Sequence, residues 1–127
     1  MVRLVLTTAV ATLIVSGHAA TSAPLLDLRL SQRMLTAPGA LSITAFVAKD
    51  EANRSLTIEA ESEGFYRSSL IALHGAASSR PHSVRYTSLP EGEYLIRVSL
   101  HGADLRLAVT EQTAEVFGRP PESSPPR

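Results

Sequence analysis

The stretch LPEGEYLIRV, residues 89–98, joins a turn to the start of a strand. Pro90 presets the backbone φ angle of the turn, and Gly92 can adopt backbone angles that other residues avoid. Apolar side chains then recur at every second position: Tyr94, Ile96, Val98 and Leu100. A period of two is typical of a β-strand with one buried face. The stretch therefore predicts a turn that leads into a half-buried strand.

The same period of two recurs along most of the chain. Further inward positions are predicted at Leu26, Leu28 and Leu30; at Leu41, Ile43, Ala45 and Val47; at Leu56, Ile58 and Ala60; and at Val84 and Tyr86. We expect one strand over residues 25–35, and a central or covered strand over residues 66–75, whose middle is apolar on both faces. About seven short strands separated by turn residues predict an all-β fold, an antiparallel β-sandwich.

The spacing of Leu89, Pro90, Gly92 and Tyr94 resembles the L-P-x-G-x-Y entry to the penultimate strand of fibronectin type III-like and other bacterial immunoglobulin-like modules. The resemblance implies an immunoglobulin-like β-sandwich with a tyrosine corner. In such a corner the Tyr94 ring is buried and its hydroxyl bonds the backbone upstream. Because modules of this kind serve unrelated functions, the resemblance predicts a fold and no activity.

The N-terminal residues 1–23 have the pattern of a signal peptide. Arg3 precedes an uncharged apolar run over residues 4–15, and small residues follow. This run is shorter than the about 20 residues that a membrane-spanning helix needs, although an uncleaved anchor is the alternative. We therefore expect a periplasmic or secreted protein with no membrane span after signal removal. The sandwich domain is predicted over residues 24–117, followed by a disordered Pro-rich tail over residues 118–127.

Composition and motifs argue against several classes of function. With 12 basic and 12 acidic residues the chain has no excess positive charge for nucleic acid, and without cysteine it has neither disulfides nor a catalytic thiol. Neither a Gly-x-Ser-x-Gly elbow nor a Gly-rich phosphate loop occurs. His74, His82 and His101 lack a second ligand at metal-pair spacing and are interpreted as strand and turn residues. We predict no catalytic, cofactor-binding or metal-binding residues, and no enzyme activity.

Three glutamates at alternate positions, Glu59, Glu61 and Glu63, could act as paired carboxylates of a glycosidase. An exposed strand face offers no cleft that would raise either pKa, so we interpret them as a solvated face opposite Arg67 or Arg85.

The segment Phe65, Tyr66 and Arg67 is the candidate interaction loop, because aromatic and arginine side chains dominate binding hot spots. The alternative is that Phe65 and Tyr66 plug one end of the sandwich. The sequence thus predicts a non-catalytic exported module for binding or structural support in the cell envelope. Its partner would be another envelope or secreted protein, or a carbohydrate. A second hypothesis is an accessory subunit or inhibitor of an exported enzyme that acts through Phe65–Arg67.

Overall fold

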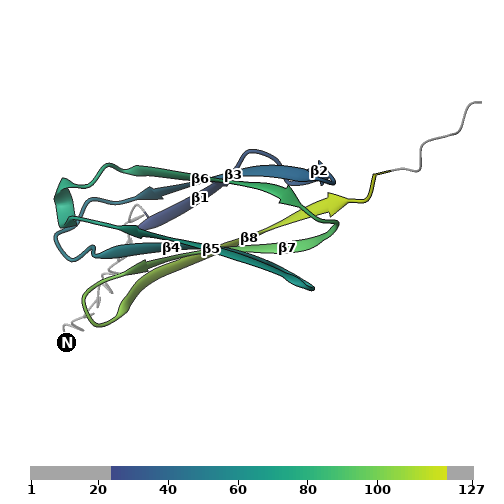
Figure 1. The fold of residues 1–127 in the computed structure, drawn as a ribbon. Coiled ribbons are helices and arrows are strands. Elements are labelled where there is room, and N and C mark those ends of the chain that lie inside the picture. Colours follow the sequence, from purple (N-terminus) through teal and green to yellow (C-terminus); the bar gives the residue numbers. More distant parts are fainter. Residues whose placement is uncertain (1–23, 120–127) are drawn as a thin grey trace, which may run out of the picture.

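The computed structural model describes residues 24–119, most of which lie in strands (Figure 1). The predicted signal peptide and residues 120–127 of the predicted tail lie outside the described residues. The strands are β1 (Leu26–Leu30), β2 (Met34–Thr36), β3 (Gly39–Val47), β4 (Ser55–Ser62), β5 (Phe65–Ala72), β6 (Pro81–Leu89), β7 (Gly92–His101) and β8 (Arg106–Phe117), with one 3₁₀ turn, η1 (Gly75–Ala77). Within this range, no helix is long and apolar enough to cross a membrane.

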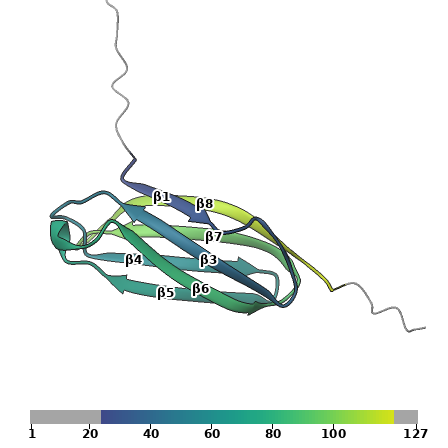
Figure 2. The ribbon, with the colours of Figure 1, turned by 90° about the horizontal axis from the view of Figure 1, so that it is seen from above.

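The strands form two sheets that face each other (Figures 1 and 2). One sheet has the order β1-β3-β6, and the other has the order β2-β8-β7-β4-β5. The pairs are antiparallel except for β2 and β8, which run parallel. The predicted all-β fold with two packed sheets is confirmed.

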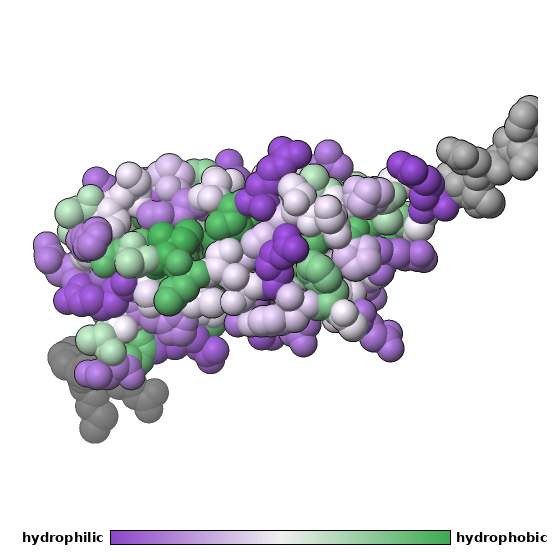
Figure 3. Space-filling model, in the orientation of Figure 1, coloured by the Kyte–Doolittle hydropathy of each residue, from purple (hydrophilic) through white to green (hydrophobic). Residues whose placement is uncertain are grey.

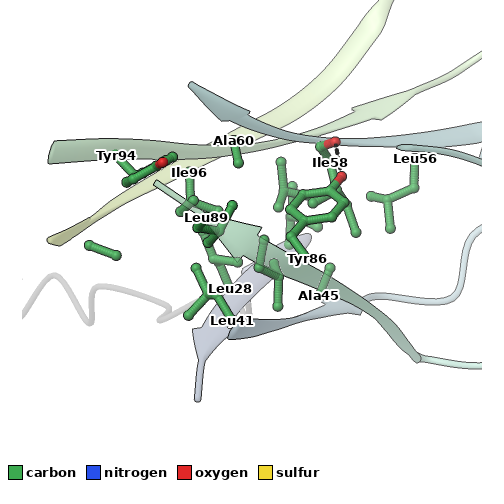
Figure 4. Packing of buried hydrophobic residues seen from close by; sticks show 14 of the residues in the cluster. Leu28, Leu41, Ala45, Leu56, Ile58, Ala60, Tyr86, Leu89, Tyr94 and Ile96 are labelled. Carbon is green, nitrogen blue, oxygen red and sulfur yellow. Dashed lines mark hydrogen bonds between the residues drawn. The ribbon is translucent and has the colours of Figure 1, made fainter. Parts of the chain in front are cut away.

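Side chains that alternate along the strands meet between the two sheets and form one core (Figure 4). Leu56, Ile58 and Ala60 of β4 are fully buried, and so are Tyr94, Ile96 and Val98 of β7. The predicted alternation on β3 is also confirmed, from Leu41 to Val47. Each large aliphatic side chain buried in this way contributes roughly 1.5–3 kcal/mol.

The first predicted strand, residues 25–35, is divided between the sheets. β1 pairs with β3, whereas β2 pairs with β8 of the other sheet, and residues 31–33 carry the chain across. The crossing is held by the Ser31 amide, which donates to the Ser42 carbonyl, and by the Glu115 amide, which donates to the Arg33 carbonyl. The expectation of one continuous strand was wrong, because alternation fixes which side chains are buried and does not fix the sheet that a strand joins.

The prediction that residues 66–75 form a central or covered strand was also wrong. β5 lies at an edge of the five-stranded sheet and pairs with β4 alone. Its apolar outward side chain, Leu70, is 74% exposed, while Ile71 on the opposite face packs against the core. The middle of the segment is therefore apolar on both faces because Ile71 packs against the core and the apolar side chain of Leu70 is exposed to solvent.

Candidate functional site

The turn between β6 and β7 is closed by Tyr94. Its ring is fully buried, and its hydroxyl donates a hydrogen bond of 2.6 Å to the carbonyl of Pro90. Gly92 has a φ of +154°, and a Cβ atom at that position would lie 2.5 Å from Ser62 Oγ. Burial raises the pKa of the Tyr94 hydroxyl above its ordinary value. This tyrosine fastens a turn to the sheet and offers no reactive group to solvent.

A second buried tyrosine, Tyr86 on β6, connects the two sheets. Its hydroxyl donates to the carbonyl of Ile58 over 3.0 Å (Figure 4). The same hydroxyl lies 2.8 Å from Ser69 Oγ. A phenol has one proton, so the Ser69 hydroxyl donates to the Tyr86 oxygen. Burial is the main cause that raises the pKa of Tyr86. The sequence predicted that the Tyr86 side chain points inward, but no local motif predicted the hydrogen bonds of its hydroxyl with Ile58 and Ser69.

The predicted interaction loop is in fact the beginning of a strand. Phe65, Tyr66 and Arg67 open β5, directly after a turn in which Gly64 has a φ of +77°. The short turn and the pairing of Ser62 with Phe65 place all three residues in a β-hairpin. Alternation along this strand therefore sends neighbouring side chains to opposite faces.

The three side chains consequently have different surroundings. The Phe65 ring packs edge-on against Tyr94, with ring centroids 5.7 Å apart. The Arg67 guanidinium lies over the Phe65 and Tyr86 rings, at 5.5 Å and 5.7 Å, and donates to the Thr87 carbonyl over 3.4 Å. Tyr66 is 60% exposed and turns to the opposite face. The three residues thus differ: Phe65 packs against the core, Arg67 is exposed with its guanidinium over the Phe65 ring, and Tyr66 faces solvent on the other side of the strand.

Tyr66 belongs to a surface that we call the outer face, the side of β5, β4, β7 and β8 turned away from the core. Its members are Tyr66, Ser68 and Leu70; Glu61, Glu59 and Thr57; Leu95, Arg97 and Ser99; and Thr113, Glu111 and Val109. The strand register aligns these side chains in rows across the sheet. The outer face is the largest assembly of outward-facing side chains that the five-stranded sheet provides.

A charged row crosses the middle of the outer face. Arg97 lies between two glutamates, with contacts of 3.6 Å to Glu59 and 2.8 Å to Glu111. The Tyr66 hydroxyl donates to Glu59 over 3.0 Å, and the bond to Glu111 raises the pKa of Arg97. The sequence predicted Arg67 or Arg85 as the partner of the glutamates. Arg67 instead lies on the face of the sheet opposite to these glutamates, and Arg85 belongs to the other sheet.

Uncharged side chains fill the neighbouring row, which consists of Leu70, Thr57, Ser99 and Val109. Leu70 is 74% exposed and Val109 37% exposed, whereas Ser99 between them is nearly buried. On the other side of the charged row, Glu93 lies directly opposite Glu115. Neither glutamate has an ion-pair partner among the described residues, so this part of the sheet carries excess negative charge, and like charges placed opposite each other destabilise the strand pair.

The histidines do not form a common site. Within residues 24–119, no group of three or more His, Asp or Glu side chains is placed to hold a metal ion. His82 on β6 has a buried Nε2 atom that lacks a hydrogen-bond partner in the same range.

Comparison with known proteins gives a likeness of fold. No protein-family model matches the chain, and no curated protein matches its sequence significantly. A superoxide reductase (neelaredoxin) from Ignicoccus hospitalis is similar in structure, with a TM-score of 0.59 and 10% identity, over 73% of this chain and 80% of that one. A variant of the same reductase gives a TM-score of 0.52 and 12% identity, over 74% of this chain and 79% of that one.

A CARDB domain from Pyrococcus furiosus gives a TM-score of 0.47 and 13% identity, over 72% of this chain and 87% of that one. Identities this low relate the folds alone.

Proposed function

We propose that the chain is an exported, non-catalytic binding module of the immunoglobulin-like class, which works in the periplasm or outside the cell. The signal-peptide pattern of residues 1–23 supports export. The strand order, with three strands facing five, and the closed Tyr94 corner support the immunoglobulin-like assignment. The outer face supports a role as a binding module, because polar and apolar side chains are aligned on it in rows across four strands.

The observation that carries this proposal is the exposure of Tyr66, Leu70 and Val109 around an ordered charge row. Exposed apolar groups next to fixed charges are the composition of a protein-binding surface, where apolar anchors supply affinity and charges supply register. Within the described residues Glu61, Glu93 and Glu115 have no ion-pair partner. We therefore infer that the partner is a protein with basic side chains around an apolar one.

A carbohydrate partner is less well supported than a protein. Sugar-binding faces present aromatic rings as a platform, because ring faces stack on the apolar faces of sugars. On this sheet the exposed aromatic side chains are Tyr66 on β5 and Phe117 at the end of β8, and β4 and β7 lie between them. An inhibitor that inserts Phe65–Arg67 into an enzyme is likewise less well supported, because these residues belong to a strand and Phe65 packs against the core.

A pull-down from the envelope and secreted fractions of the producing cells tests the proposal. Wild-type protein is compared with Tyr66→Ala and Glu61→Lys, which change the outer face, and with Arg85→Ala, which changes the opposite sheet. We expect a partner that elutes with salt, is lost in both outer-face variants and is retained by Arg85→Ala. Loss of an anchor residue weakens binding by about 1–2 kcal/mol, roughly tenfold in Kd. Identical partners for all four proteins would contradict the proposal.

A further inference from the structure

Four strands lie at sheet edges in the described part of the chain: β1, β6, β2 and β5. Three of them carry features that hinder the addition of another strand. The β1 carbonyl of Leu28 accepts a 2.6 Å hydrogen bond from the Gln112 side chain, and β2 spans three residues. The β6 strand begins with Pro81, and its pairing with β3 has a register shift.

The remaining edge, β5, has none of these protections. It has eight residues, its register with β4 is regular, and it contains neither proline nor lysine. Its single charged side chain, Arg67, is exposed, and its guanidinium lies over the Phe65 and Tyr86 rings. A long, regular and nearly uncharged edge is a template for pairing with another strand.

The backbone of β5 presents its free groups at every second residue. The amide of Leu73 donates to the Arg54 carbonyl beside β4. In an antiparallel pair the backbone groups of alternate residues point to the same side, so the odd-numbered residues of β5 form their backbone hydrogen bonds with β4. The backbone N–H and C=O groups of the even-numbered residues therefore point away from the sheet. These residues are Tyr66, Ser68, Leu70 and Ala72.

We propose that β5 pairs with β5 of a second copy of this chain, antiparallel, about a two-fold axis that passes beside Ser69. In this register Tyr66 is opposite Ala72 of the second copy, and Leu70 is opposite Ser68. Each large side chain thus meets a small one, and Tyr66 reaches Leu70 of the second copy along the diagonal. The free backbone groups of both copies bond each other, and the two five-stranded sheets become one continuous sheet.

The other face of β5 is compatible with the same register. Arg67 is opposite Ile71 of the second copy, so the two arginines are offset along the strands and do not face each other. Ile71 and Val84, both half-buried, lie where β5 and β6 share one side of the sandwich (Figure 2). Figure 3 faces this side and shows hydrophobic side chains along part of the seam between the sheets. A second copy would cover this seam.

The pairing goes beyond the proposed function and does not depend on it. It leaves the outer face of each copy open and joins the two faces into a larger surface. Because the test below uses the purified protein alone, a failure of pairing is distinguishable from a failure to find a partner.

Sedimentation of the purified full chain, from about 10 μM to about 1 mM, tests the pairing, since an interface of two strands belongs to the weak class. We expect reversible dimers for the wild type. Leu70→Lys puts a charge on the paired edge and should weaken dimerisation at least tenfold. Leu105→Lys changes a side chain that is 63% exposed in the turn between β7 and β8, which β4 separates from β5, and it should dimerise like the wild type. A wild type that stays monomeric, or equal dimerisation of both variants, would overturn the proposal.

A single cysteine tests the register, because the chain has no cysteine of its own. Directly opposite residues in such a non-hydrogen-bonded pair have Cα atoms about 4.5 Å apart, within the range of a disulfide. Ser69→Cys should therefore form a covalent dimer under mild oxidation, and Ala72→Cys, opposite Tyr66, should not. Equal cross-linking at the two positions would refute this register. Circular dichroism of both variants verifies folding, and if Ser69→Cys does not fold the sedimentation result decides.

Discussion

At the scale of single residues, the three tyrosines of the chain use their hydroxyl groups in different ways. Tyr94 bonds a carbonyl four residues upstream, Tyr86 bonds a carbonyl of the opposite sheet, and Tyr66 bonds the exposed carboxylate of Glu59. The first two bonds are buried or nearly so, where an unpaired hydroxyl or carbonyl is costly. The third is in solvent, where water can replace either partner. We therefore expect the hydroxyl groups of Tyr94 and Tyr86 to contribute more to the stability of the fold than the hydroxyl group of Tyr66.

Removal of the Tyr94 hydroxyl should destabilise the fold. Tyr94→Phe leaves the Pro90 carbonyl without its partner, and we expect the free energy of unfolding to fall by about 1 kcal/mol. Tyr66→Phe is the matched control and should change it by less than about 0.5 kcal/mol. Urea denaturation of both variants measures the difference. Equal values would show that the corner hydroxyl contributes nothing.

Alkaline pH should weaken the fold through the two buried tyrosines. Burial raises the pKa of Tyr86 and Tyr94 above 10.0, so the unfolded chain releases these protons before the folded chain does. The stability they contribute is fully present below about pH 10 and is lost as pH rises through the folded pKa values. Urea midpoints measured between about pH 8 and about pH 11.5 should fall more steeply for the wild type than for Tyr86→Phe. A parallel fall would contradict this origin.

Local sequence predicted one of these tyrosines better than the other. The Leu89–Tyr94 spacing lies within six residues, so the turn and its partner carbonyl are encoded together. Tyr86 contacts Ile58 and Ser69, 28 and 17 residues away. A contact of that kind depends on which strands face each other, and this is absent from any short window. The expected loop at Phe65, Tyr66 and Arg67 was wrong for a related reason, because the tight turn at Gly64 places these residues in a strand.

At the scale of elements, β5 and β6 are edges of different sheets that are joined by side chains. The Tyr86–Ser69 hydrogen bond and the Arg67 contact with Thr87 connect them on one side of the sandwich. On the opposite side Gln112 of β8 bonds Leu28 of β1. The two layers are therefore fastened along both long sides, in addition to the core between them.

This connection should be visible as an energetic coupling. In a double-mutant cycle with Tyr86→Phe and Ser69→Ala, each single change should cost about 1 kcal/mol, and the coupling should be at least about 0.5 kcal/mol. The cycle is measured by urea denaturation below about 10 μM protein, where weak dimers are dissociated. Simple additivity would mean that the two residues stabilise the fold independently.

At the scale of the whole molecule, the alternation of apolar residues was sufficient to predict the layers but not their edges. Strands β3, β4 and β7 are flanked on both sides and carry regular alternation, which the sequence indicates clearly. The errors fell on β1, β2 and β5, which are three of the four edge strands in the described part of the chain. Edge strands have fewer neighbours, so their side chains are less constrained and their pattern is less informative.

The core should respond to truncation in proportion to burial. Ile58→Ala removes a fully buried side chain from the centre of the sandwich, and we expect a loss of about 2–5 kcal/mol. That loss is a large part of the about 5–15 kcal/mol that stabilises an ordinary domain. Leu105→Ala, at a 63% exposed position, should stay within about 0.5 kcal/mol of wild type. Thermal unfolding of the two proteins checks the contrast, and similar melting temperatures would refute the assigned core.

The parallel pairing of β2 with β8 has a mechanical consequence. Residue 24 and residue 119, the limits of the described chain, lie at opposite ends of the sandwich (Figures 1 and 2). A force that pulls these limits apart acts along β2 and β8 in opposite directions, so the bonds between Met34–Thr36 and Glu115–Phe117 are loaded together. Bonds loaded in shear break as a group, whereas bonds in an unzipping geometry break one after another. A tether attached at both limits would therefore resist extension before the core opens.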